Sequence, residues 1–466
     1  MKTLIQAALA FICRHSFLRS PFLAALLFRA SLHRIGRRSG SERYTALMMP
    51  RPGLREDALA VLEDMPEFSV LSTYPGIMKA IAAGFLPVTI DDNNYANLSA
   101  EEEAAKQRYR AFLQDVMRHL LKLVRIDVIV SGNFAYFAER ELHAAAEALG
   151  VPFIVLHKEN LKTPARAAFF TQHYRRRRGA FGGREVLVYN DIEREVQINA
   201  GVVPAERIEV CGMPRLDRCH AWRRASAGRS RPEQPTMLFF TFGAKTGLPV
   251  LRRKGAEGDY SESLPEFDNL DWHNTVQETM QAIAGFARTH PHVRVVVKSK
   301  LSSSQIEIFR VAAGGHIPPN LELIDGGDPL DLLQEAWAVV GMNSTALLEA
   351  LAMDAVVICP AYAEAADPDA RQWIVDLGSA IEYARSPDQL IARLSQIASG
   401  PAPIVAGELG AGAANALRHW AGNADGKASE RVGAAILREM KTARHRSEHE
   451  PHASPEAPAP AGNQTG

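Results

Sequence analysis

The sequence predicts an α/β protein built from two doubly wound domains that face a central cleft. The chain has 466 residues, which is more than one ordinary core requires. After residue 65, short runs rich in β-branched residues alternate with helical segments, as in a parallel sheet covered by helices. This alternation stops at a stretch rich in Arg, Ser and Pro and then resumes, which indicates two separate units.

The first half of the chain contains two βαβ patterns. Four short apolar runs are predicted strands: 126–131, 151–157, 185–189 and 207–211. Two segments of good helix formers lie between them: 138–149 and 191–200. Gly150 and Gly201 follow these helices, and glycine is a common helix stop. These elements predict a first Rossmann-like domain over residues 65–222.

The stretch 223–235 (RRASAGRSRPEQP) lacks apolar periodicity and is the predicted linker. A second Rossmann-like domain is predicted over residues 236–400. Its strands are expected in five apolar runs: 236–242, 293–298, 321–324, 338–341 and 355–359. Its helices are expected at four places: 271–289, 304–312, from Leu330 onwards and around Glu349. Because strands and helices alternate throughout, this half is also expected to be doubly wound.

The two ends of the chain depart from this pattern. The first 40 residues carry seven Lys or Arg and no acid, so residues 1–64 are predicted to form a basic amphipathic extension. This segment either lies on an anionic membrane surface or packs on the first domain, and the sequence leaves both interpretations open. Neither of its apolar runs, Leu4–Cys13 and Pro21–Phe28, reaches the roughly 18 to 20 residues that cross a bilayer. Helices are expected over 401–446, and a disordered tail over 447–466.

Composition argues against several classes of function. Lys plus Arg (53) equals Asp plus Glu (53), so no excess of positive charge marks a nucleic-acid-binding protein. The four cysteines lie far apart in the sequence, which argues against structural zinc and favours a reducing compartment. We therefore expect a cytoplasmic protein, with peripheral attachment to the inner face of the cytoplasmic membrane as the open alternative.

A stretch with the sequence VVGMNSTALLE places polar residues where a buried strand ends and a helix begins. The strand ends at Gly341, and Asn343, Ser344 and Thr345 form the turn into the helix. Free backbone N–H groups at a helix N-terminus attract phosphate, and the two hydroxyls can add hydrogen bonds. Glu349 lies one turn further along, within reach of ribose hydroxyls. In the alternative interpretation, Ser344 only caps the helix and Glu349 is a surface carboxylate.

The run GMNSTALLEALA that starts at Gly341, followed by VVICP, resembles the donor-binding motif of GT-B glycosyltransferases. It is similar above all to enzymes of surface and capsular polysaccharide synthesis and to the related CDP-glycerol glycerophosphotransferases. The resemblance implies a GT-B fold in which the diphosphate meets the turn at Gly341, Ser344 and Thr345. It also implies that Glu349 holds the ribose. The turn Gly212–Asp217 (GMPRLD) is similar to the turn that closes the first domain in these families, which implies an interdomain hinge.

Further residues suited to phosphate binding follow two other strands of the second domain. Lys298 ends one predicted strand and Lys300 follows it, so both are candidates to neutralise a diphosphate, with Lys298 first. Gly243 and Lys245 lie in a glycine-rich loop after the first strand (FGAKTG), although this loop is not a Walker A sequence. A glycine-rich turn needs no ligand, so a purely structural role for this loop is an equal alternative.

Candidate general bases come from the first domain. An inverting glycosyltransferase needs a carboxylate or a histidine to accept the proton of the acceptor hydroxyl. His157 and Glu159 lie where the predicted strand 151–157 ends, at the carboxyl edge of the sheet. Asp92, with Asp91 beside it, is a third candidate. A retaining enzyme needs no such base, and His157 suits a position near the core equally well.

These observations predict a glycosyltransferase of cell-surface polysaccharide synthesis, such as capsule formation. It would move a sugar from a nucleotide-activated donor in the second domain to a glycan or lipid-linked acceptor in the first. The resemblance implies no metal and no cofactor besides the nucleotide-sugar substrate, since helix dipoles and basic side chains neutralise the leaving diphosphate. Three alternatives remain open: a nucleotide-sugar 2-epimerase, a glycerophosphotransferase, and a GT-B scaffold without catalysis in a polysaccharide assembly complex.

Overall fold

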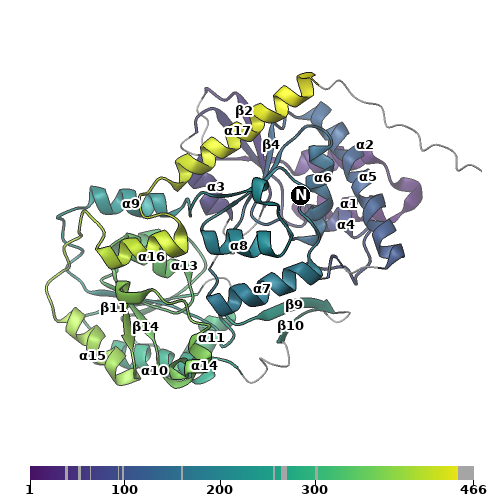
Figure 1. The fold of residues 1–466 in the computed structure, drawn as a ribbon. Coiled ribbons are helices and arrows are strands. Elements are labelled where there is room, and N and C mark those ends of the chain that lie inside the picture. The colour runs from purple at the N-terminus through teal and green to yellow at the C-terminus, as the bar shows by residue number, and fades with distance from the viewer. Residues whose placement is uncertain are drawn as a thin grey trace, which may run out of the picture.

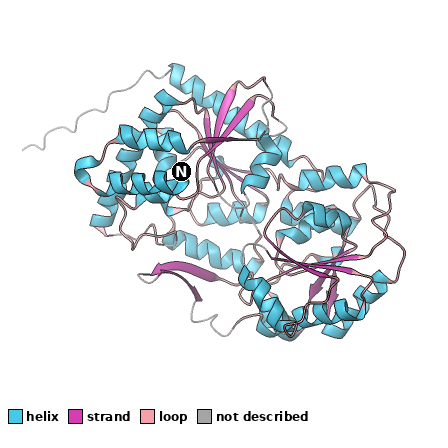
Figure 2. Ribbon diagram, turned by 180° about the vertical axis from the view of Figure 1, so that it is seen from behind, coloured by secondary structure: helices cyan, strands magenta, loops and turns pink. Residues whose placement is uncertain are grey.

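The fold consists of two α/β domains that lie next to each other, each with a sheet between layers of helices (Figure 1). Figure 2 shows both domains from behind, with the strands of each sheet between helices. The computed structural model describes the following residues: 1–36, 40–50, 54–62, 65–92, 94–96, 99–158, 161–255, 258–263, 270–299 and 303–449. The predicted fold class, two Rossmann-like domains in a GT-B arrangement, is confirmed.

The first domain contains a seven-stranded sheet in the order β1-β3-β2-β4-β5-β6-β7. Its strands are β1 (His33–Ile35), β2 (Tyr44–Met48), β3 (Phe68–Ser72), β4 (Val128–Ser131), β5 (Phe153–Leu156), β6 (Glu185–Val188) and β7 (Ile208–Val210). Only β1 pairs antiparallel with its neighbour, and the other pairs are parallel. The four strands expected between residues 126 and 211 are all present.

Helices cover both faces of this sheet. They are α1 (Lys2–Arg14), α2 (Pro21–Ser31), α3 (Leu54–Leu62), α4 (Ile77–Ala82), α5 (Ala100–Leu123), α6 (Phe137–Glu147), α7 (Pro164–Arg177) and α8 (Asp191–Asn199). The next helix, α9 (Leu216–Ala225), packs against the core of the second domain instead. Among the described residues, no helix is both long enough and apolar enough to cross a membrane.

The first domain begins earlier than residue 65, so the predicted extension over 1–64 is wrong. Within that segment β2 lies between β3 and β4, in the interior of the sheet. Helices α1 and α2 bury Leu9, Cys13 and Phe28 in the core that also contains α5 residues. The physical reason is that both helices carry an apolar face, which is removed from water by packing on this core.

The second domain contains a six-stranded parallel sheet in the order β12-β11-β8-β13-β14-β15. Its strands are β8 (Thr236–Phe240), β11 (Arg294–Ser299), β12 (Leu321–Asp325), β13 (Ala338–Val340), β14 (Val356–Pro360) and β15 (Glu382–Ala384). Its helices are α10 (His273–Thr289), α11 (Ser303–Ala312), α12 (Leu330–Glu335), α13 (Thr345–Ala352), α14 (Pro368–Arg371), α15 (Pro387–Ala398) and α16 (Ala411–Ala421). A hairpin of β9 (Val250–Gly255) and β10 (Gly258–Ser263) projects from this domain (Figure 1).

Strands β8 and β13 mark the switch point of the second sheet. From β8 the chain continues to β11 on one side, and from β13 it continues to β14 on the other. In open doubly wound sheets, ligands bind outside the carboxyl ends of the strands at such a point. The loop after β8 and the turn after β13, both singled out from the sequence, therefore lie at the expected place.

The chain crosses between the domains twice. The predicted linker 223–235 begins inside α9, and the guanidinium of Arg231 donates to the carbonyls of Leu333 and Met353, which fixes this segment on the second domain. After α16 the chain returns, and α17 (Ala428–His449) packs on the first domain. The predicted helical unit 401–446 is thus divided between the two domains. Of the predicted tail, 447–449 end α17, and 450–466 lie outside the described residues.

Candidate functional site

The carboxyl ends of the two sheets meet at the domain interface. Arg215, shortly after β7 of the first domain, donates to Thr345 at the start of α13 in the second. Leu161, after β5, lines the same small cavity as Asn343 and Ser344. The turn before α13 therefore lies at the contact between the domains, as a GT-B architecture requires.

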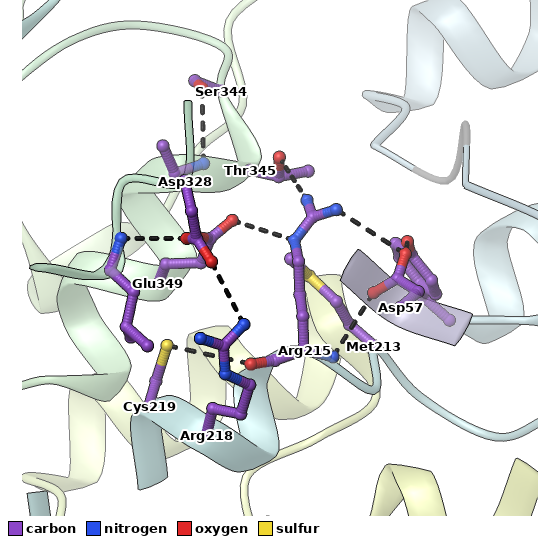
Figure 3. A network of polar contacts seen from close by, with 12 residues as sticks. Asp57, Met213, Arg215, Arg218, Cys219, Asp328, Ser344, Thr345 and Glu349 are labelled. Carbon is purple, nitrogen blue, oxygen red and sulfur yellow. Dashed lines mark hydrogen bonds and ion pairs between the residues drawn. The ribbon is translucent and has the colours of Figure 1, made fainter. Parts of the chain in front are cut away.

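Arg215 connects three elements through its side chain (Figure 3). Its Nε donates to Oε1 of Glu349 across 3.0 Å, and one Nη donates to Oγ1 of Thr345 across 2.9 Å. The other Nη lies 3.6 Å from Oδ2 of Asp57 on α3. The hydroxyl of Tyr189 donates to the same carboxylate oxygen across 2.5 Å. This cluster links α3, the turn after β7 and α13 in one polar network.

The opposite charges in this network stabilise each other's ionised forms. Burial raises the pKa of Glu349 and of Asp57, and the Arg215 guanidinium opposes that rise in both. For Arg215, burial alone would lower the pKa, but the two carboxylates outweigh it and raise the pKa. Arg215 therefore keeps its positive charge at the N-terminal end of α13. Glu349, which the resemblance assigns to a ribose, has an internal cation as its partner in this structure.

The turn into α13 is held by its own side chains. Ser344 caps the helix, since its Oγ accepts from the backbone N–H of Ala346 across 3.3 Å. Asn343 has a positive φ of 51°, donates to the Thr246 carbonyl and accepts from the Val375 N–H. The cavity beside this turn measures only about 10 Å³, which is too small for a diphosphate. In this conformation the predicted phosphate site is closed.

The predicted basic residues contact backbone carbonyls. Lys298 donates to the carbonyl of Gly326, directly after β12. Because β8 lies between β11 and β13, Lys298 is two strand spacings, roughly 10 Å, from the strand that leads into α13. Lys245 donates to the Leu270 carbonyl across 2.8 Å, and the N–H of Gly243 donates to Thr246 Oγ1 across 2.8 Å. Lys300 lies outside the described residues.

The candidate general bases of the first domain also contact other groups of the protein. His157 is fully buried, and its Nε2 lies 3.0 Å from Oε1 of Glu193 on α8. Lys162 forms an ion pair with the other oxygen of that carboxylate. Asp92 accepts a 2.6 Å hydrogen bond from the N–H of Phe137 at the start of α6. Glu159 lies outside the described residues, and a role as general base stays a prediction for all three candidates.

Sequence analysis missed a second cavity at this interface, which measures about 410 Å³. Thr163 and Pro164, at the N-terminus of α7, line it from the first domain. Arg371 on α14 and Tyr383 on β15 line it from the second domain, together with Trp420 on α16. One feature of the sequence could have located this cavity: β14 ends at Pro360, and the loop after a parallel strand lies at the carboxyl edge of the sheet, where ligands bind.

No protein-family model matches the sequence, and no protein with curated annotation matches it. Among solved structures, the chain is similar to UDP-GlcNAc 2-epimerase from Neisseria meningitidis bound to UDP-GlcNAc, with 12% identity over 85% of this chain and 99% of that chain and a TM-score of 0.46. It is also similar to α,α-trehalose 6-phosphate synthase from Burkholderia multivorans, with 12% identity over 89% of this chain and 100% of that chain and a TM-score of 0.43. Similarity at this level of identity concerns the fold alone.

Proposed function

We propose that this protein transfers a sugar from a nucleotide-activated donor to an acceptor, and that the donor occupies the cavity between α7 and the carboxyl ends of β14 and β15. The observation that carries this proposal is the position of the cavity, which has walls from both domains and a volume of about 410 Å³. Cavities of this size hold typical small ligands, and domain interfaces are their usual place.

Two features of the cavity favour an anionic ligand. The 14-residue helix α7 begins at its wall, and the N-terminal end of a helix carries a partial positive charge. Arg371, an exposed guanidinium, lines the cavity from the second domain. A nucleoside diphosphate there would meet the N-terminal end of α7 and the Arg371 charge, with the Asp376 carboxylate also in the lining, and Tyr383 and Trp420 offer aromatic surface for its base.

The turn before α13 belongs to the same proposal. Ile374 and Asp376 line the large cavity, whereas their neighbours Val375 and Leu377 line the small one beside Ser344. Because residues 374–377 line both cavities in alternation, a movement of this segment would join them. The diphosphate would then reach Gly341, Ser344 and Thr345, with the Arg215 charge beside it, and Glu349 would hold both Arg215 and the ribose.

An adjoining groove is suited to the acceptor. It measures about 570 Å³, is lined by α7 and α8 of the first domain, and shares Pro164, Asp376 and Trp420 with the proposed donor cavity. We propose a glycan or lipid-linked acceptor of cell-surface polysaccharide synthesis. A nucleotide-sugar 2-epimerase or a glycerophosphotransferase would use the same donor cavity, and a scaffold would leave any bound nucleotide sugar unchanged.

The test is ligand binding followed by product analysis. UDP, CDP and GDP are compared with their nucleosides by thermal shift, because a ligand that binds only the folded state raises Tm. At least one diphosphate is expected to raise Tm, and its nucleoside is expected to have a smaller effect. The matching nucleotide sugar is then incubated with the protein, and transfer, epimerisation and hydrolysis are separated by product analysis. The proposal fails if none of the three diphosphates raises Tm.

A further inference from the structure

The two N-terminal helices expose a large amount of apolar surface. Among the described residues, eleven large apolar side chains are exposed, and seven of them lie within the first 26 residues. We call these seven the apolar patch: Met1, Leu4, Phe11, Phe17, Phe22, Leu23 and Leu26. Leu4 is 75% exposed, Phe11 is 55% exposed and Phe17 is 83% exposed. Exposed apolar side chains gathered on one segment indicate an interaction surface.

The patch continues from α1 into the turn that leads to α2. Leu4 and Phe11 are two turns apart and share one face of α1, opposite the face that buries Leu9. The rings of Phe11 and His15 have centroids 4.5 Å apart, and those of His15 and Phe17 are 5.8 Å apart. The aromatic surface therefore extends from α1 into the turn that leads to α2.

The helices that carry the patch are fixed on the domain. Arg19 in the connecting turn donates to the carbonyl of Cys13 across 2.9 Å and to that of Gly84 across 3.0 Å. Gly84 packs so closely that a Cβ there would lie 2.5 Å from the Cys13 backbone. The patch is thus presented by a rigid pair of helices.

Basic side chains surround the patch. Lys2, Arg14 and Arg29 are exposed on α1 and α2, and the first acid in the chain is Glu42. Helix α5 lies alongside, as the contact between the rings of Phe22 and His119 shows, with centroids 5.6 Å apart. It adds further exposed cations at its C-terminal end: Arg118, which pairs with Asp115, and Lys122.

We propose that α1 and α2 dock the protein onto an anionic lipid bilayer. The apolar patch would enter the headgroup region, and Lys2, Arg14 and Arg29 would contact lipid phosphates. Each basic residue near such a surface increases partitioning roughly fivefold. Figure 1 shows α1 and α2 on the side of the first domain remote from the second domain, so docking would leave the interdomain cavities accessible. This surface does not depend on the proposed transfer reaction.

A second copy of the chain fits the patch less well than lipid. In a symmetric dimer, the same surface faces itself, so the arginines of one copy would approach those of the other. Like charges opposed across an interface disfavour association, whereas lipid phosphates would neutralise them. The charge of the patch therefore favours the bilayer.

Vesicle sedimentation with the full-length protein tests this proposal. The wild type is expected to bind vesicles of equimolar phosphatidylglycerol and phosphatidylcholine, and to bind phosphatidylcholine alone much more weakly. The double variant Phe11→Ser/Phe17→Ser is expected to lose about tenfold or more in partitioning, since both rings leave water on docking. Arg14→Glu/Arg29→Glu is expected to lose at least as much at low salt.

The matched control is Ile308→Ser/Val311→Ser, which changes two exposed apolar side chains of α11 in the other domain. This control is expected to sediment with the anionic vesicles like the wild type. Absence of wild-type binding to these vesicles, or an equal loss in the α11 control, would overturn the proposal. So would a wild-type dimer in gel filtration that Phe11→Ser/Phe17→Ser dissociates, combined with no vesicle binding.

Discussion

Arg215 and Glu349 lie 134 positions apart in the sequence, and the Nε of one donates to the carboxylate of the other across 3.0 Å. This contact joins the turn that ends the first domain to α13 of the second. It places a fixed positive charge beside the helix N-terminus at which the proposed donor diphosphate would arrive. This ion pair therefore contributes both to the domain arrangement and to the proposed ligand site.

The substitution Glu349→Ala is expected to destabilise the protein by about 2–4 kcal/mol, because it leaves a largely buried guanidinium with one carboxylate fewer. The side chain of Glu349 is 8% exposed and that of Arg215 is 17% exposed. Urea unfolding followed by circular dichroism measures the change. If Glu349 instead serves the ribose alone, stability is retained and only the nucleotide-induced rise in Tm disappears.

The control for this prediction is Glu382→Ala. Glu382 pairs with Arg393 across 2.6 Å, but their side chains are 41% and 33% exposed. Exposed pairs contribute about 0–1 kcal/mol, so this variant is expected to unfold almost like the wild type. Equal losses in the two variants would show that the interdomain position of Glu349 has no special effect on stability.

Five of the six strands of the second sheet could be predicted, and four of these, β8, β11, β13 and β14, are almost entirely buried and appear as continuous apolar runs. β8, which is entirely buried, is the clearest example. Strand β15, with two of its three residues partly exposed, was missed. In the first sheet, β2, which lies before residue 65, begins with two partly exposed positions in five residues, and β1 has only three residues. Such short strands are hard to separate from loops, so the start of the first domain was missed.

The candidate site could be predicted in part. The sequence marked the turn at Gly212–Asp217 and the turn before α13, and the structure brings Arg215 of the first to Thr345 of the second. The contact between Arg215 and Thr345 could not be predicted from the sequence, because it depends on how the two domains pack against each other. The proposed donor cavity was missed for the same reason, since Thr163 and Arg371 converge only when both domains are in place.

Stability at acid pH is expected to depend on Glu193. Burial would raise its pKa, but the Lys162 charge and the His157 hydrogen bond outweigh burial and lower the pKa from 4.5 to about 2. Since the folded-state pKa is the lower one, this stabilisation is present above pH 4.5 and is lost as the pH falls toward 2, by about 3 kcal/mol in total. Unfolding free energies measured from pH 5 to pH 2 should show a shallower decline for Glu193→Gln.

An exposed glutamate on the same helix provides the comparison for that titration. Glu195→Gln on α8 removes one carboxylate at the surface and is expected to keep the wild-type decline. A steep decline that persists in Glu193→Gln would mean that other groups dominate acid unfolding.

The variant Arg371→Ala is expected to weaken nucleoside diphosphate binding about tenfold, which corresponds to one charge-assisted contact. Isothermal titration with the diphosphate that raises Tm measures Kd. Arg385→Ala removes an exposed arginine that does not line the cavity, and it is expected to leave Kd unchanged. An unchanged Kd in Arg371→Ala would remove this residue from the proposed donor site.

Gly422, where α16 ends and the chain returns to the first domain, is expected to tolerate no side chain. A Cβ there would lie 1.8 Å from the carbonyl oxygen of Tyr189, and the residue has a φ of +60°. Gly422→Ala must therefore displace the return crossing, and we expect a loss of about 3 kcal/mol or more in unfolding free energy. Gly201→Ala is the matched variant, because Gly201 has a φ of +69° but open space around its Cβ position. Gly201→Ala measures the cost of the backbone conformation alone, which is about 1 kcal/mol of unfolding free energy. Similar losses of unfolding free energy in the two variants would contradict a tight contact at Gly422.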